Sequence, residues 1–124
     1  MNARTYGQVI GVVLLALGVV GLFSGDQFLG LLNIEIIEDV VHLAVGAVLL
    51  YVGFMLKDAA MGRSIVTVVG ATLLLVGVIG FVSPSLFGLL PKVGYNLVDN
   101  VVHLVLGALG IYVGRMGSTD TVKA

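Results

Sequence analysis

The sequence has no cysteine, no tryptophan and only two prolines, and charged residues make up 10% of its 124 positions. The absence of cysteine excludes disulfide bonds, iron–sulfur clusters, thiolate metal sites and a cysteine nucleophile. The few charges sum to −1, which leaves no basic surface to attract a nucleic acid. These absences remove several large classes of function before any motif is considered.

Apolar residues dominate what is present. Hydrophobic residues make up 59% of the chain, and the mean hydropathy is +1.17. This composition is typical of an integral membrane protein, whose immediate partner is the lipid bilayer. Apolar windows of roughly 18–22 residues can cross a hydrocarbon core of about 30 Å. We therefore predict a single membrane domain over residues 1–124 with transmembrane helices at 6–23, 35–56, 64–82 and 96–115.

The second half of the chain repeats the first. The element Val-Val-His-Leu-x-x-Gly-Ala occupies residues 40–47 and returns at residues 101–108. We predict two repeats, approximately 5–57 and 63–116, and each of them contains two spans. Because two is an even number, both repeats enter the membrane in the same direction. The predicted fold is all-α, with four transmembrane helices that form two parallel, pseudo-symmetric helical hairpins.

The basic residues indicate an orientation. For four spans, five of them fall on the side of the two termini and one falls on the other side: Arg4, Lys57, Arg63, Arg115 and Lys123 against Lys92. The positive-inside rule places the side that is richer in lysine and arginine in the cytoplasm. We expect a multi-pass protein of the prokaryotic cytoplasmic (inner) membrane with both termini in the cytoplasm.

Glycine is abundant, with 18 residues, and it recurs at intervals of seven along each predicted span. This interval keeps glycines on one helix face, where small residues let membrane helices approach closely. We predict that these faces pack within one bundle or between protomers. Contact with a ligand is the less favoured alternative. The predicted packing positions are Gly11, Gly18, Gly46, Gly53, Gly70, Gly77, Gly107 and Gly114.

Each repeat carries one histidine inside a membrane-length helix, at His42 and at His103. Residues three and four apart share a helix face, so Glu38 and Asp39 flank His42, and Asp99 flanks His103. Ionisable groups at such a depth are costly, and they suggest a functional site by default. In the simplest interpretation, the histidines hydrogen-bond a carboxylate or a carbonyl group and keep the hairpins in register.

A second interpretation makes the histidines cofactor ligands. His42 and His103 would bind a haem or chlorin as two axial imidazoles. Gly46 and Gly107, one turn beyond, would then leave clearance for the flat macrocycle, although helix packing explains them equally well. Lipid is the other small-molecule partner that we expect.

Divalent metal binding and proton or ion handling are further alternatives. Imidazoles together with the carboxylates of Glu38 and Asp99 form a donor set for a divalent metal. Histidine is also the usual switch for a proton near neutral pH. However, residues 43–54 and 104–114 contain no charged side chain, so one protomer offers no polar path across the membrane. An oligomer could still build a pore between copies.

Enzyme chemistry has little support in the sequence. No serine lies beside either histidine, and no glycine-rich loop is placed to hold a phosphate. A metal-dependent membrane enzyme is the exception to consider, but it would need a larger set of polar residues around its substrate. We predict that the protein is not an enzyme.

The duplicated Val-Val-His-Leu-x-x-Gly-Ala element, with acidic or amide residues just before it, resembles small four-helix prokaryotic membrane protein families of unknown function. The resemblance covers roughly residues 5–115 and implies a fold and a membrane location without an activity. With so little mass outside the membrane, we expect a structural or interaction protein. It would act as a homo-oligomer or as an accessory subunit of a larger membrane complex.

Overall fold

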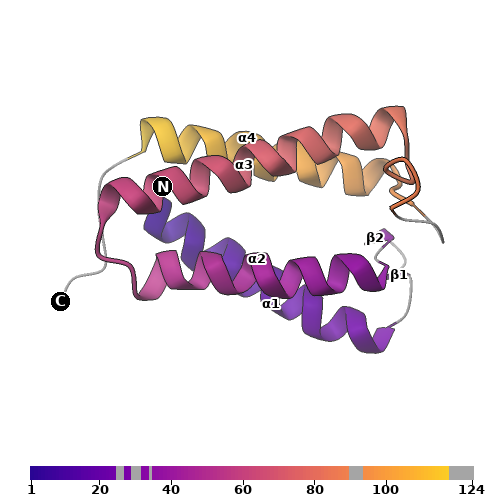
Figure 1. Cartoon of the computed structure of the whole chain (residues 1–124), viewed down its shortest axis with the longest axis horizontal. Coiled ribbons are helices and arrows are strands. Elements are labelled where there is room, and N and C mark those ends of the chain that lie inside the picture. Colours follow the sequence, from indigo (N-terminus) through magenta and orange to yellow (C-terminus); the bar gives the residue numbers. More distant parts are fainter. Residues whose placement is uncertain (25–26, 29–31, 34, 90–93, 118–124) are drawn as a thin grey trace.

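The computed structural model describes residues 1–24, 27–28, 32–33, 35–89 and 94–117. Four helices follow one another along the chain, and a short antiparallel strand pair, in which Gln27 faces Asn33, lies between the first two (Figure 1). The elements are α1 (Ala3–Ser24), β1 (Gln27–Phe28), β2 (Leu32–Asn33), α2 (Ile36–Phe54), α3 (Ala59–Val82) and α4 (Leu97–Met116).

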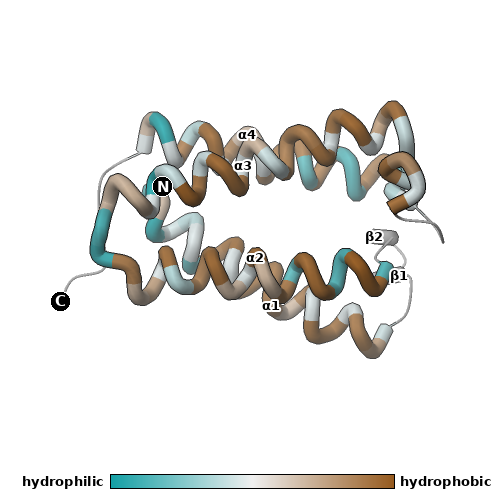
Figure 2. The backbone as a smooth tube through the Cα atoms, in the orientation of Figure 1, coloured by the Kyte–Doolittle hydropathy of each residue, from teal (hydrophilic) through white to brown (hydrophobic). Residues whose placement is uncertain are grey.

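All four helices are long and apolar enough to cross a membrane, and hydrophobic residues follow one another along each of them (Figure 2). The chain is therefore a multi-pass integral membrane protein. α1 packs along α2, and α3 packs along α4, whereas the two pairs meet each other at far fewer places. The predicted all-α fold of two hairpins is confirmed.

Two helices begin earlier than the sequence-based prediction placed them. α3 begins at Ala59, before the predicted residue 64, because the Asp58 side chain accepts a hydrogen bond of 3.0 Å from the Met61 amide. α1 begins at Ala3, before residue 6, and the Asn2 side chain accepts from the Thr5 amide at 2.8 Å. A prediction based on apolar windows does not register such polar capping residues.

In the first hairpin, glycines bring the backbones of α1 and α2 into direct contact. A β-carbon added at Gly11 would lie 2.9 Å from the Leu50 amide nitrogen, and one at Gly46 would lie 2.8 Å from the Leu15 amide nitrogen. Real β-carbons essentially never approach another atom so closely. The two helices can pack at this distance only because neither glycine has a side chain.

The second hairpin repeats these contacts. A β-carbon at Gly70 would lie 2.6 Å from the Ile111 amide nitrogen, and one at Gly107 would collide with the Leu74 amide nitrogen. Each of these residues is the counterpart of one in the first hairpin, by the same repeat that the sequence carries. The duplicated sequence thus folds into two hairpins with equivalent internal packing.

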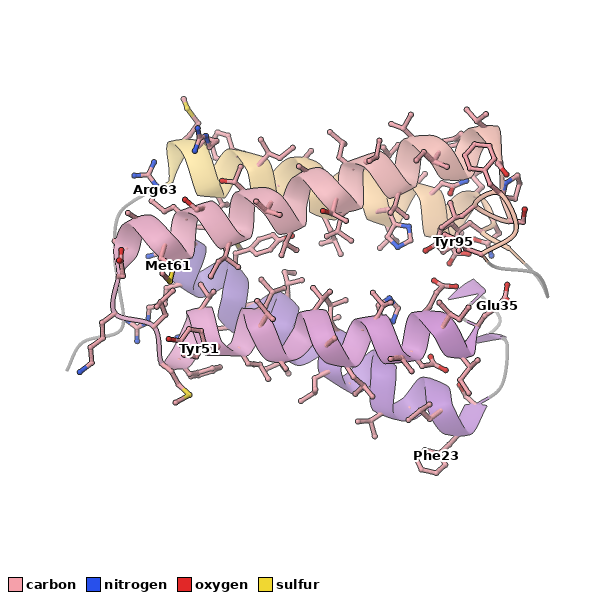
Figure 3. All side chains as sticks on the ribbon, viewed as in Figure 1. Phe23, Glu35, Tyr51, Met61, Arg63 and Tyr95 are labelled. Carbon is pink, nitrogen blue, oxygen red and sulfur yellow. The ribbon has the colours of Figure 1, made fainter. Side chains whose placement is uncertain are left out.

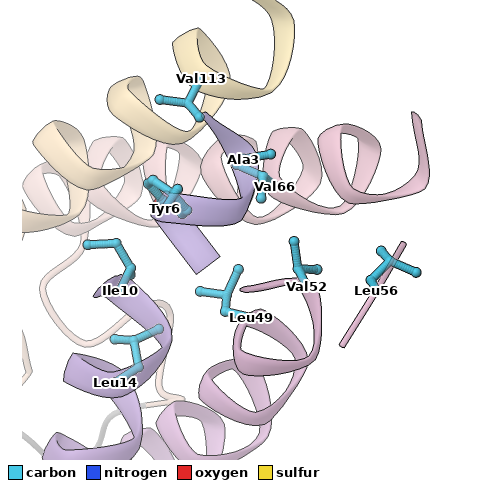
Figure 4. Close-up of a cluster of buried hydrophobic side chains, with 9 residues drawn as sticks. All are labelled: Ala3, Tyr6, Ile10, Leu14, Leu49, Val52, Leu56, Val66 and Val113. Carbon is cyan, nitrogen blue, oxygen red and sulfur yellow. The ribbon is translucent and has the colours of Figure 1, made fainter. Parts of the chain in front are cut away.

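The apolar core between the hairpins gathers toward the end of the molecule where α1 and α3 begin (Figure 4). We call this the basic end, because Arg4, Lys57, Arg63 and Arg115 belong to it. The Tyr6 hydroxyl donates a 2.9 Å hydrogen bond to the Leu106 carbonyl and so joins α1 to α4. The core consists of Ala3, Tyr6, Ile10, Leu14, Leu49, Val52, Leu56, Val66 and Val113.

The opposite end, where α2 and α4 begin, is built differently. Phe23, near the last residue of α1, is 87% exposed and points away from the other helices (Figure 3). Buried polar residues lie here instead of a large apolar cluster, and we call this the polar end, defined by Glu35, Glu38, Tyr95 and Asp99. The two ends therefore join the hairpins by different means.

Candidate functional site at the polar end

The acidic residues of the polar end first serve as helix caps. The Glu35 amide donates to Glu38 Oε1 at 3.3 Å at the start of α2. At the start of α4, the Asn96 amide donates to Asp99 Oδ2 at 2.9 Å, and the Asp99 amide donates to Asn96 Oδ1 at 2.8 Å. A capping residue followed by an acid three positions later is a known sequence signature of a helix start. The capping roles of Glu38 and Asp99 are therefore predictable from the sequence, although the interpretation of these residues as metal ligands does not include them.

The same residues connect the two hairpins. The Tyr95 hydroxyl, from the segment that precedes α4, donates a hydrogen bond to the Glu38 carboxylate of α2. The adjacent Gly94 amide donates to Glu35 Oε2 at 3.0 Å. Figure 3 shows Tyr95 and Glu35 at the same end of the molecule, on opposite hairpins. No local sequence pattern indicates this role of Tyr95, because its partner Glu38 is distant in the chain.

The backbone holds Tyr95 in place for this contact. Its amide donates to the Pro84 carbonyl oxygen at 2.7 Å. Gly94 has a φ of +64°, and a β-carbon there would lie 2.7 Å from the same Pro84 oxygen. Only glycine fits this position without strain, so Gly94 fixes how the segment crosses toward α2.

Burial raises the pKa of Tyr95 above its ordinary value of 10.0, and the neighbouring Glu38 carboxylate raises it further. The phenol therefore keeps its proton at any physiological pH and remains a hydrogen-bond donor. Glu38 itself is only 6% exposed, and its described neighbours include Glu35 and Asp99. Lys92, which the sequence assigns to this side of the membrane, lies outside the described residues.

The two histidines adjoin this network. The rings of His103 and Tyr95 meet edge to face, with centroids 4.7 Å apart and planes at 65°. His42 lies within electrostatic range of His103. The Nδ1 atoms of both histidines are buried, and neither forms a hydrogen bond within the described ranges. The predicted hydrogen bond of each histidine to a carboxylate or a carbonyl is therefore not made through Nδ1 within the described part of the chain.

The predicted metal ligands His42, His103, Glu38 and Asp99 all lie at the polar end. Glu38 neighbours Asp99, and His103 neighbours His42. Within the described ranges, however, no three histidine, aspartate or glutamate side chains come close enough together to hold one metal ion. Of these four residues, Glu38 takes part in a hydrogen bond between the hairpins, with Tyr95.

The glycines that follow the histidines do not border a ligand space. Gly46 faces Leu15 of α1, and Gly107 faces Leu74 of α3, in each case across the interior of its own hairpin. The missing side chains make room for a neighbouring backbone. This arrangement argues against the clearance for a macrocycle that the sequence suggested.

Asp39 and its counterpart Asn100 also point into their own hairpins. A β-carbon at Gly21 would collide with Asp39 Oδ1, and one at Gly80 would collide with Asn100 Oδ1. The two side chains are 2% and 4% exposed. Although Asp39 is close to His42 in sequence, its carboxylate lies against α1 in the hairpin interior.

The other predicted packing glycines lie in the same hairpin interiors. A β-carbon at Gly53 would lie 2.5 Å from the Gln8 amide nitrogen, and the Gln8 side chain donates to the Gly53 carbonyl at 2.9 Å. Equivalent close approaches occur at Gly18, Gly77 and Gly114. Of the two packing alternatives, these contacts match the one within a single bundle.

Comparison with known proteins identifies a family model for part of the chain. Residues 1–55 match a domain of unknown function (DUF4383). The matched segment runs from the start of the chain to Met55, the C-cap of α2, and so spans the first hairpin. No curated protein and no solved structure matches the chain. The resemblance to small membrane proteins of unknown function is confirmed for this segment, and it brings no activity with it.

Proposed function

We propose that the protein is a non-enzymatic structural membrane protein that acts through contacts with other polypeptides in the same bilayer. It would do so as a homo-oligomer or as an accessory subunit of a larger complex. The observation that carries this proposal is that the polar side chains at the polar end have structural roles. Glu38 and Asp99 cap helices, Glu35 and Glu38 join the hairpins, and Asp39 packs inside one.

The packing at the basic end supports the same proposal over transport through one protomer. Tyr6, Leu49, Val66 and Val113 are fully buried and fill the space between the hairpins. The Tyr6 hydroxyl is already hydrogen-bonded to a backbone carbonyl. A path for ions or protons would need polar groups through this region.

The helix faces that point away from the bundle offer the surface for a partner. α3 is the least covered of the four helices, with 22% of its apolar window buried. Val68, Leu75, Val78 and Val82 lie exposed along it at intervals of seven, three and four residues. This spacing forms one continuous apolar stripe, which can pack against another membrane helix or against lipid.

Site-specific photo-crosslinking in native membranes tests the proposal. A photoreactive residue replaces Val68 or Val78 on α3, and matched variants replace the equivalent valines Val9 and Val19 on α1, which are also exposed. We expect a discrete crosslinked polypeptide from one of these faces and not from its counterpart. If all four positions yield only lipid adducts, the proposal is wrong.

A ligand-binding role for His42 and His103 is the second candidate, because both Nδ1 atoms are buried without a hydrogen bond to the described residues. A metal ion or a haem or chlorin iron would use such nitrogens. Absorption spectra and metal analysis of protein purified from its native membrane provide the test. A band or a stoichiometric metal that disappears in His42→Ala/His103→Ala would favour ligation. A colourless, metal-free protein would count against it.

We further propose that the protein resides in the cytoplasmic membrane of a prokaryote, with the basic end in the cytoplasm. The distribution of lysine and arginine supports this orientation. Single cysteines at Met55 and Phe87, which lie exposed near opposite ends of the hairpins, can be labelled with a membrane-impermeant reagent in intact cells. Phe87→Cys should be labelled and Met55→Cys protected. The reverse pattern would invert the proposed topology.

A further inference from the structure

Each hairpin is built to move as one body. Backbone contacts at glycines recur along the interface of α1 with α2, from Gly7 to Gly18, and along that of α3 with α4. Where a glycine backbone touches the neighbouring backbone, the two helices cannot slide or separate without losing close packing over several turns. Motion within a hairpin is therefore costly.

The two hairpins are held to one another unequally. At the basic end they share a covalent connection at residues 55–58, an apolar core and the hydrogen bond from Tyr6 to Leu106. Arg63 adds hydrogen bonds within the second hairpin, to the carbonyls of Gly114 and Arg115, and fixes that end of α3 and α4.

At the polar end, the described contacts between the hairpins include two hydrogen bonds, from Tyr95 to Glu38 and from Gly94 to Glu35. The strand β2 of the first hairpin also contacts α4 of the second. The segment that provides both donors belongs to the connection before α4, which is anchored to Pro84 of its own hairpin. Breaking these bonds would leave the internal packing of both hairpins intact.

We propose that the two hairpins form a hinge at the basic end and are latched at the polar end by the Tyr95–Glu38 and Gly94–Glu35 hydrogen bonds. Release of the latch separates the polar ends of α2 and α4 and further exposes His42 and His103, which are half-buried in the closed structure. Because His103 lies against the Tyr95 ring, movement of Tyr95 away from α2 changes the surroundings of the histidine directly. This device goes beyond the proposed interaction role and does not depend on it.

Each hydrogen bond of the latch makes a modest contribution to the closed state. Loss of one hydrogen bond of this kind shifts an equilibrium between closed and open states by roughly tenfold. The apolar core at the basic end contains nine buried side chains, and it would remain in place during the movement.

Pulsed electron spin resonance in lipid nanodiscs measures the proposed motion. The chain has no cysteine, so pairs of introduced cysteines give unambiguous spin-labelled positions. Ile36→Cys with Leu97→Cys reports the polar end, and Met55→Cys with Met116→Cys reports the basic end. All four side chains are exposed, and the members of each pair are counterparts in the two repeats.

Three conservative variants separate the latch from the hinge. Tyr95→Phe removes the hydroxyl that bonds Glu38 and keeps the ring against His103. Tyr6→Phe makes the same change in the hinge core, and Tyr112→Phe makes it on an exposed surface. Folding of every variant is verified by its helical circular dichroism and its elution from a sizing column.

We expect Tyr95→Phe to lengthen and broaden the distances at the polar end while those at the basic end keep the parent distribution. Tyr112→Phe should change neither pair. Unchanged polar-end distances in Tyr95→Phe would overturn the latch. Equal broadening at both ends, with Tyr6→Phe indistinguishable from Tyr95→Phe, would overturn the hinge and the rigid hairpins.

Chemical modification of the histidines provides a second readout. The chain contains only two histidines, so the ultraviolet absorbance of carbethoxylated imidazole reports the reaction of diethyl pyrocarbonate with His42 and His103 when the protein is purified without a histidine tag. We expect Tyr95→Phe to be modified roughly tenfold faster than the parent and than Tyr112→Phe. Equal rates in a variant whose polar end has opened would show that opening does not uncover the histidines, and would refute that part of the proposal.

Discussion

The two hairpins of this protein have the same internal packing, but they differ in the charges at their polar ends. Five glycine contacts of the first hairpin, at Gly11, Gly18, Gly21, Gly46 and Gly53, recur at the equivalent positions of the second. By contrast, Glu35 and Asp39 of the first repeat correspond to Asn96 and Asn100 of the second. The comparison teaches that backbone packing defines the hairpin, whereas the polar residues at the start of α2 and α4 differentiate the two copies.

The difference also gives each hairpin a distinct part in the contact between them. The first hairpin provides the carboxylate acceptors, Glu35 and Glu38, and the second provides the donors from Gly94 and Tyr95. In the sequence of the first repeat, Ile34 takes the position of Tyr95 and has no hydroxyl, so the repeat has no counterpart of the donor that bonds Glu38. Two nearly equivalent units are thus joined by an asymmetric interface, and each unit serves as a control for the other.

The largest expected effect comes from filling the glycine contacts. Gly46→Leu and Gly107→Leu should each destabilise the protein by about 3 kcal/mol or more, because the added side chain must push a neighbouring backbone away. Thermal unfolding in detergent, followed by circular dichroism, measures the loss. Similar losses in both variants would support equivalent hairpins, and a loss in one alone would break the equivalence.

Gly62→Ala is the matched control for these glycine variants. A β-carbon there would meet Val52 at 3.5 Å and Leu56 at 3.6 Å, which are ordinary contacts. Alanine also favours the helical state over glycine by up to about 1 kcal/mol. We expect unchanged or slightly higher stability. A large loss at Gly62 would mean that any change of glycine is harmful, whatever the space around it.

Exchanging the residue types at the equivalent positions 39 and 100 should give the next largest effect on stability. Asn100→Asp places a new carboxylate in a buried interface within the membrane, at a cost of roughly 3 kcal/mol. Asp39→Asn should be much milder, since the equivalent site against Gly80 already accommodates an amide. Unfolding titrations at neutral pH provide the comparison. Equal losses in the two variants would contradict this asymmetry.

A smaller effect should distinguish the two histidines. His103 makes an edge-to-face contact with Tyr95, so His103→Ala should cost about 1 kcal/mol more than His42→Ala. The same unfolding titrations measure both variants. In the Tyr95→Phe background the ring remains, and the difference should persist. A His42→Ala loss as large as that of His103→Ala would point to an additional partner for His42.

The smallest effect under physiological conditions concerns the pH dependence through Tyr95. Its pKa in the folded protein is raised above the ordinary value of 10.0, so its stabilising contribution is complete below pH 10 and is lost as the pH rises further. The stability difference between the parent and Tyr95→Phe should stay constant up to about pH 10 and then shrink by about 1.4 kcal/mol per pH unit. A difference that changes between pH 6 and 9 would implicate another group.

Much of the architecture follows from the sequence alone. The apolar windows predict four spans, and the duplicated histidine element predicts two hairpins, because hydropathy and spacing along one helix are properties of neighbouring residues. The capping acids Glu38 and Asp99 belong to the same class of local signals, although an interpretation that concentrated on the histidines passed over them.

Only the tertiary structure decides which groups meet across the hairpins. The sequence places Asp39 beside His42, but the rotation of α2 about its axis turns this carboxylate toward Gly21 of α1. The sequence also gives no indication that Tyr95 reaches Glu38, because the two residues are 57 positions apart. Their contact depends on how the segment at Gly94 crosses between the hairpins. Sequence determines what can enter the membrane and pair locally, and the packing angles of whole helices determine which distant side chains come within hydrogen-bonding distance.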